Sequence, residues 1–234
     1  MLRSPRSRRR ALRIAVLAIG AAPIVGLIAR YADDDLGANP IEALTHETGA
    51  WALRFLMASL ATTPLRRLSG WRMLSLERRT LGLLAFFYAS LHLSIYAVLD
   101  QGLGTGGVGL EAQWQYLQED ILERPYITIG FATFLLLLTL AATSTRGVTR
   151  RLGRRWKPLH RIVYLAGIGA VVHFLWLVKA DTREPLVYAV LLALLLGIRV
   201  MWALQARQKR RTQQSTRPAQ PPAEPSTKAG LPRR

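Results

Sequence analysis

The sequence predicts an all-α, polytopic membrane helix bundle of about six transmembrane helices, with the N and C termini in the cytoplasm. Half of the 234 residues are apolar, although the formal net charge is +18. The apolar residues form blocks of about 18 to 20, long enough to cross a hydrocarbon core of roughly 30 Å. The short stretches between these blocks hold nearly all the charge. Apolar and basic residues are therefore kept apart, as they are in a membrane protein.

Six apolar blocks are the expected membrane spans. They cover residues 11–29, 44–63, 81–99, 126–143, 159–178 and 186–204. Proline is tolerated in the first turn of a helix, where its missing N–H would be unpaired anyway. Prolines near the block edges therefore mark helix boundaries: Pro64, Pro125, Pro158 and Pro185.

A cleaved signal peptide is the alternative interpretation of the first span, because residues 1–10 are basic and precede an apolar run. The run is long for a signal peptide, and Ala21, Ala22 and Pro23 make a poor cleavage site. We therefore expect a basic cytoplasmic N-terminus of residues 1–10 and a retained first span.

The charges orient the six spans, because Lys and Arg remain on the cytoplasmic side of short loops. One side holds the N-terminal arginines, the basic C-terminal residues, and the loop cations Arg66, Arg67, Arg72, Arg78, Arg79, Arg146, Arg150, Arg151, Arg154, Arg155, Lys157 and Arg161. The other side holds most of the acids: Asp33, Asp34, Asp35, Glu42, Glu47, Asp100, Glu111, Glu119, Asp120, Glu123, Asp181 and Glu184. Both distributions place the two termini inside.

Two segments outside the spans have distinct compositions. The external loop 100–124 begins with several glycines and continues as residues 111–122, which fit a short amphipathic helix on the membrane surface and a docking site for an external partner. Residues 207–234 are polar and rich in Pro, Gln, Ser and Arg, which predicts a disordered cytoplasmic tail after a transmembrane domain of residues 11–206.

Composition also excludes several classes of function. The basic residues flank apolar spans, so they indicate membrane topology and contacts to anionic lipid and argue against nucleic-acid binding. Cysteine is absent, which excludes disulfides, zinc thiolates, iron–sulfur clusters and covalent c-type haem. The sequence has no Walker, Rossmann or nucleophile-elbow motif.

Three of the four histidines, His92, His160 and His173, lie in the third and fifth spans, where a polar ring is costly and usually marks an ion path or a cofactor. At 1.5 Å per residue, His92 lies about 20 Å above Arg79 and His173 about 22 Å above Pro158. The two rings therefore lie at similar depths in the outer half of the membrane, where they can be the axial ligands of one haem iron.

The other two histidines have less defined roles. His160 lies about 20 Å below His173 and has no facing histidine. It can ligate a second haem with an unusual or missing partner, or support a propionate, a quinone or a flavin. His46, beside Glu47 at the outer start of the second span, is interpreted as an interfacial residue without a ligand role.

Four arginines are candidate cofactor contacts. Arg54 lies near the middle of the second span and needs a partner. Apart from Glu47 at the outer start of the second span, the sequence places no carboxylate in a span, which favours an external anion such as a haem propionate; snorkelling or backbone carbonyls are the alternative. Arg78, Arg79 and Arg161 can bind propionates or a flavin phosphate on the inner face, or act only as topology determinants.

Three stretches resemble a known family. They are TGAWALRFLMASLATTPLRRLSGW, LERRTLGLLAFFYASLHLSIYAVLD and RRWKPLHRIVYLAGIGAVVHFLW. Together they are similar to the MsrQ (YedZ) family, haem-binding membrane subunits of the periplasmic methionine-sulfoxide reductase system, and to the wider ferric-reductase-like transmembrane family. The resemblance covers residues 44–202, within a ferric-reductase-like core of residues 44–204.

The resemblance implies a multi-pass inner-membrane electron-transfer subunit with one or two b-type haems and FMN, and no substrate-reducing site of its own. Electrons would come from the quinone pool or a cytosolic flavin reductase and pass to the periplasmic molybdopterin subunit MsrP. His92, His160 and His173 fall at the family's haem-ligand positions. The third span has a single histidine, unlike a symmetric four-histidine arrangement. A ferric reductase and a non-redox transporter or structural subunit are the alternatives.

Overall fold

The computed structural model describes residues 5–71, 73, 77–103, 110–178 and 181–215. It contains two compact units, Met1–Gly197 and Ile198–Arg234, which are described separately. Every regular element in the described ranges is helical. The predicted all-α fold class is therefore confirmed.

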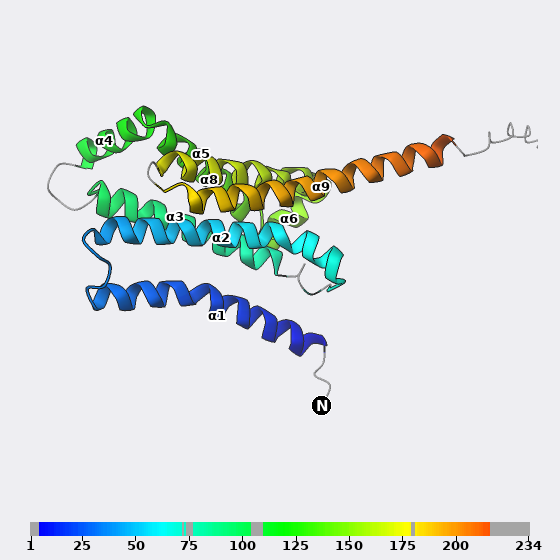
Figure 1. Ribbon diagram of the computed structural model, residues 1–234, viewed down its shortest axis with the longest axis horizontal. Coiled ribbons are helices and arrows are strands. Elements are labelled where there is room, and N and C mark those ends of the chain that lie inside the picture. The colour runs from blue at the N-terminus through cyan, green and yellow to red at the C-terminus, as the bar shows by residue number, and fades with distance from the viewer. Residues whose placement is uncertain (1–4, 72, 74–76, 104–109, 179–180, 216–234) are drawn as a thin grey trace, which may run out of the picture. The chain divides into compact units, whose positions relative to one another are not determined.

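Long helices and short connecting turns alternate along the chain (Figure 1). The elements are α1 (Pro5–Ala32), α2 (Pro40–Ser69), α3 (Arg78–Ile95), the π-helical turn η2 (Tyr96–Asp100), α4 (Leu110–Glu123), α5 (Pro125–Ala142), α6 (Arg146–Leu152), the 3₁₀ turn η3 (Gly153–Arg155), α7 (Trp156–Leu159), the 3₁₀ turn η4 (His160–Ile162), α8 (Val163–Leu177) and α9 (Arg183–Ser215).

Five helical segments in the described part of the chain are long and apolar enough to cross a membrane. They are Arg10–Ala32, Arg78–Asp100, Pro125–Ala142, Arg146–Leu177 and Arg183–Gln213. Large apolar side chains on these segments are exposed, for example Ile19, Leu138 and Leu194. Such a surface is expected where lipid, and not water, surrounds the helices. The protein is a multi-pass membrane protein.

The predicted second span is present as α2 but is less apolar than the other five. It carries Glu42, His46, Glu47 and Arg54, which lower its hydropathy. It is nevertheless the helix with the most buried positions, and it packs against α1, α3 and α8. Its polar residues can thus contact protein in place of lipid.

The ends of α2 differ from the sequence prediction. At its start, the Asn39 side chain accepts a hydrogen bond from the Glu42 backbone N–H at 3.2 Å, and Pro40 occupies the first turn. Pro64 does not mark the end, because it lies inside the helix. Good helix formers follow it, and Gly70, with φ of 70°, ends the helix in a left-handed conformation.

The predicted fifth span is interrupted. α7 ends at Leu159, a 3₁₀ turn covers His160–Ile162, and α8 begins at Val163. Pro158 is the third residue of α7, where its missing N–H costs no helical hydrogen bond. The third span also ends irregularly, because the π-helical turn η2 follows α3.

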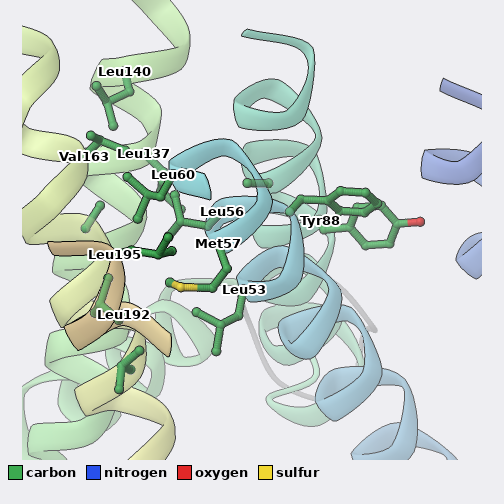
Figure 2. Close-up of a cluster of buried hydrophobic side chains, with 14 of the residues drawn as sticks. Leu53, Leu56, Met57, Leu60, Tyr88, Leu137, Leu140, Val163, Leu192 and Leu195 are labelled. Carbon is green, nitrogen blue, oxygen red and sulfur yellow. The ribbon is translucent and has the colours of Figure 1, made fainter. Parts of the chain in front are cut away.

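The core of the first unit lies between α2, α5, α8 and the first part of α9 (Figure 2). Leu56 and Leu60 of α2 meet Leu137 and Leu140 of α5 there. Tyr88 of α3 also belongs to this buried cluster, and its hydroxyl donates a hydrogen bond of 2.6 Å to the Gly20 carbonyl of α1. Two antiparallel pairs, α2 with α3 and α5 with α8, form the most extensive helix contacts (Figure 1).

The structure contains the predicted external helix but differs from the prediction for the C-terminal tail. The predicted external amphipathic helix is present as α4, whereas the glycines Gly104, Gly106, Gly107 and Gly109 lie outside the described residues. The polar tail does not begin at Arg207, because α9 continues to Ser215 in the second unit. Gln, Arg, Lys and Ala in this stretch are good helix formers. Residues 216–234 lie outside the described ranges.

The cysteine-free chain allows a direct test of whether α2 crosses the membrane. Asp33 precedes α2 and Leu68 lies in its last turn, and both side chains are exposed. In intact cells, a membrane-impermeant maleimide should label D33C but not L68C, and permeabilised cells should show labelling of both. Labelling of both sites in intact cells would contradict a sixth span.

Candidate functional site

Two histidine rings face each other between the two antiparallel helix pairs. His92 lies on α3 and His173 on α8, with ring centroids 6.2 Å apart and ring planes at 81°. Two imidazole nitrogens that bind one metal ion at about 2 Å each lie about 4 Å apart, and each ring centre is roughly 1 Å further out, which gives about 6 Å between ring centres. The observed separation therefore fits one metal ion between the two rings.

The hydrogen bonds of both rings leave the correct nitrogen available for a metal. His92 Nδ1 lies 2.8 Å from the Thr45 carbonyl oxygen, and His173 Nδ1 lies 2.7 Å from the Tyr126 carbonyl oxygen. A carbonyl oxygen only accepts hydrogen bonds, so each Nδ1 carries the proton and donates it. Each neutral ring then has its lone pair on Nε2, which is the usual tautomer of a metal-binding histidine held by a backbone carbonyl.

Both rings line one cavity of about 730 Å³. This volume lies within the range of roughly 300–1,000 Å³ typical of cofactor and ligand sites. Toward the inner side the cavity is lined by apolar residues such as Leu53, Leu56 and Leu137, whereas Asn39, Asp100 and Arg124 line it at the outer helix ends. The cavity can hold a large, flat and mostly apolar group whose polar substituents point outward.

A polar network fastens α4 beside the outer end of this cavity. The Tyr96 hydroxyl donates to the Asp120 carboxylate, and Arg124 Nε forms an ion pair with Asp120 at 2.7 Å. Arg124 also donates to the Tyr126 hydroxyl at 3.4 Å. Tyr96 is the first residue of the π-helical turn η2, and such turns are frequent at functional sites. The sequence reasoning missed this network, because it connects three separate segments.

His160 lies apart from the other two span histidines and does not line the cavity. Its Nε2 is 3.1 Å from Thr143 Oγ1, and its ring stacks on Trp156 with centroids 4.1 Å apart. The Trp156 indole N–H donates to the Thr143 carbonyl at 3.1 Å. His160 thus has protein partners at the inner end of α5, whereas His92 and His173 share a cavity.

Arg54 has partners within the protein, in addition to the external anion, snorkelling or backbone carbonyls that the sequence left open. Its guanidinium lies 3.3 Å from Glu184 and donates to the Tyr188 hydroxyl at 3.0 Å. It also lies over the Trp51 ring, 4.7 Å from the centroid. Glu184 was placed outside the predicted sixth span, which began at residue 186, but α9 starts at Arg183 and so includes it.

The three inner arginines do not line the cavity. The Arg78 carbonyl accepts a hydrogen bond from Ser59 Oγ at 3.1 Å, and the side chains of Arg79 and Arg161 are exposed. Their cofactor roles stay predictions. Conversely, the structure places His46, which we interpreted as an interfacial residue, on the cavity wall, with its ring 5.7 Å from that of Phe174.

Comparison with known proteins identifies the family. The family model described as ferric reductase like transmembrane component matches residues 48–171, from α2 to α8. A Xanthomonas euvesicatoria protein is 51% identical over 188 residues, which is 80% of this chain and 82% of the relative. The chain belongs to the MsrQ family. A Rhodospirillum rubrum relative is 48% identical over 207 residues, 88% of this chain and 95% of the relative.

These MsrQ relatives carry the name protein-methionine-sulfoxide reductase heme-binding subunit. A Xanthomonas campestris relative of the same name is 52% identical over 192 residues, 82% of each chain. Membership in the MsrQ and ferric-reductase-like families supports a membrane redox subunit. Residues 48–171, which the family model matches, include His92, and His173 follows two residues after their end.

The Tyr96–Asp120–Arg124 network predicts a local effect on α4. In Y96F, the mostly buried Asp120 carboxylate loses one donor, which weakens the attachment of α4 by about 1 kcal/mol, or about fivefold in the opening equilibrium. Hydrogen–deuterium exchange should accelerate by about this factor in residues 110–123 and stay unchanged in α5. The control is Y116F, because Tyr116 is exposed on α4. Equal exchange in Y96F and Y116F would contradict the role of the network.

Proposed function

We propose that this chain is a membrane electron-transfer subunit that holds a b-type haem between His92 and His173. The observation that carries the proposal is the pair of histidine rings that line one cavity of about 730 Å³, with 6.2 Å between the ring centroids and each Nδ1 hydrogen-bonded to a helix carbonyl. The name of the relatives, heme-binding subunit, agrees with this cofactor. The apolar cavity wall and polar outer end suit a porphyrin with two carboxylates.

The residues around the cavity would bind and orient the haem and surround it with a medium of low dielectric constant. When bound, haem supplies one-electron redox chemistry. His92 and His173 supply two neutral nitrogen ligands, which the Thr45 and Tyr126 carbonyls hold in one tautomer. The apolar wall excludes water from the iron. Arg124 contributes a positive charge to the cavity lining, where it also contacts Asp120 and Tyr126. We propose that it binds a carboxylate of the cofactor as well.

We assign the electron acceptor to a periplasmic molybdopterin reductase of the MsrP type, which repairs oxidised methionine. The name of the relatives supports a methionine-sulfoxide reductase partner. The outer end of the cavity lies beside α4, the predicted external helix, so an external acceptor can approach the cofactor closely. The proposed electron donors are the quinone pool or a cytosolic flavin reductase.

The inner side is the proposed entry point for electrons. His160 stacks on Trp156 there, and Arg161 is the next residue in the chain. An aromatic pair with nearby arginines suits a flavin, its phosphate or a second haem. We therefore keep FMN, with Arg78, Arg79 and Arg161 as phosphate contacts, as a proposal for this side. For Arg54, contact with a haem propionate stays a proposal beside its ion pair with Glu184.

The haem assignment predicts the effect of each histidine. A reduced-minus-oxidised spectrum of the purified protein should show b-type haem. H92A and H173A should each lose most of the haem bound by this cavity, because one axial ligand is missing. H160A should retain it, since His160 does not line the cavity. A protein without b-type haem, or H92A and H173A with wild-type haem content, would refute the proposal.

A ferric reductase is the second candidate function, because the matching family model has that description. The two candidates differ in the electron acceptor. We expect the reduced protein to be oxidised at least tenfold faster by a purified MsrP-type reductase with methionine sulfoxide than by chelated ferric iron. Faster oxidation by chelated iron would favour the ferric reductase.

A further inference from the structure

The two histidines are held by two equivalent arrangements of helices. His92 on α3 donates to a carbonyl of α2, and His173 on α8 donates to a carbonyl of α5. In both cases the accepting residue precedes the histidine by 47 residues. Each pair of helices is antiparallel and in close contact (Figure 1). The cavity is therefore built from two similar halves, each with one histidine and one carbonyl.

A glycine lies one helical turn after each accepting carbonyl. Gly49 follows Thr45, and Gly130 follows Tyr126. A Cβ atom on Gly49 would lie 3.0 Å from His92 Nδ1 and 3.1 Å from Cε1. A Cβ atom on Gly130 would lie 2.7 Å from both Nδ1 and Cε1 of His173. Neither position has room for a side chain while the ring keeps its place.

Helix geometry explains why glycine occurs at these two positions. In an α-helix the Cα–Cβ bond points toward the N-terminus, so the side chain of residue i+4 lies over the carbonyl of residue i. A Cβ atom at position 49 or 130 would cover the carbonyl that accepts the histidine N–H. Glycine inside a helix is less stable than alanine by about 1 kcal/mol. At these two positions glycine lets each histidine ring reach the carbonyl oxygen to which it donates, and this hydrogen bond offsets the lower helix stability.

We propose that Gly49 and Gly130 are positioning residues for the two haem ligands. By uncovering the Thr45 and Tyr126 carbonyls, they fix the tautomer and the rotation of each ring, and so set the angle of 81° between the ring planes. This inference rests on the proposed haem site and goes beyond it, because it names what orients the ligands.

The proposal has two spectroscopic consequences. Nearly perpendicular imidazole planes give low-spin ferric haem a highly anisotropic EPR signal, whereas parallel planes give a rhombic one. A hydrogen bond from Nδ1–H to a carbonyl also makes the imidazole a stronger donor, which stabilises ferric haem and lowers its midpoint potential. Loss of this bond should therefore change the EPR signal and raise the potential.

The test compares glycine-to-alanine substitutions in the purified, haem-loaded full chain. G130A should lose at least half of the haem, because a Cβ atom at 2.7 Å displaces the ring. G49A is milder, since 3.0 Å requires a shift of only a few tenths of an ångström. It should keep haem but show a less anisotropic EPR signal and a higher midpoint potential.

The chain offers matched controls in two of its helices. An alanine Cβ at Gly82 of α3 meets Ser59 Oγ at an ordinary distance of 3.6 Å, and one at Gly26 of α1 meets no atom within 4 Å. G82A and G26A should therefore keep wild-type haem content, EPR signal and potential. Haem loss or a changed signal in both controls, equal to that of G49A, would overturn the positioning role.

The outcomes separate this inference from the proposed function. Absence of b-type haem in the wild-type protein refutes the function. Haem binding with unchanged EPR signal and potential in G49A refutes the positioning role alone. If G130A does not fold, G49A decides the question. A rhombic wild-type EPR signal, typical of parallel rings, also overturns the proposal, and it requires no variant.

Discussion

The central interaction of this protein is a hydrogen bond from a histidine Nδ1–H to a helix carbonyl, which occurs twice. It satisfies one side of a polar ring inside the membrane, where an unpaired group is costly. It also determines the tautomer, which leaves the lone pair on Nε2 in two rings that line the same cavity. Without these two bonds the rings could rotate or change tautomer, and the two ligands would no longer face each other.

The remaining architecture supports this arrangement. Leu56, Leu60, Leu137 and Leu140 pack α2 against α5 at the inner side and so fix the separation of the two halves. Other large apolar side chains of these helices, such as Leu138 and Leu194, are exposed, as expected for a surface in lipid. At the outer side, Asp120 and Arg124 connect α4 to the helices of the cavity. The same packing thus isolates the site from water on the inside and leaves polar groups at its outer end.

Much of the fold could be predicted from the sequence, because span length and charge asymmetry depend on the membrane alone. Equal depth also placed His92 and His173 opposite each other, since helix rise is constant. The partner of Arg54 could not be predicted, because it depends on where α9 starts. The contacts of Gly49 and Gly130 with the histidine rings, and the position of His46 on the cavity wall, could not be predicted either. They depend on how α2 packs against α3 and α5 against α8. Thr45 and His92 are separated by 47 residues, as are Tyr126 and His173. The sequence alone did not show that the backbone carbonyls of Thr45 and Tyr126 accept hydrogen bonds from these histidines.

The most direct test is an experimental density map of the purified, haem-loaded protein at a resolution that shows the porphyrin plane. Our account predicts a porphyrin between α3 and α8, with iron bound to Nε2 of His92 and of His173 and with its carboxylates toward Arg124. A map in which the cavity holds no porphyrin, or in which His92 or His173 does not bind iron, would contradict the account.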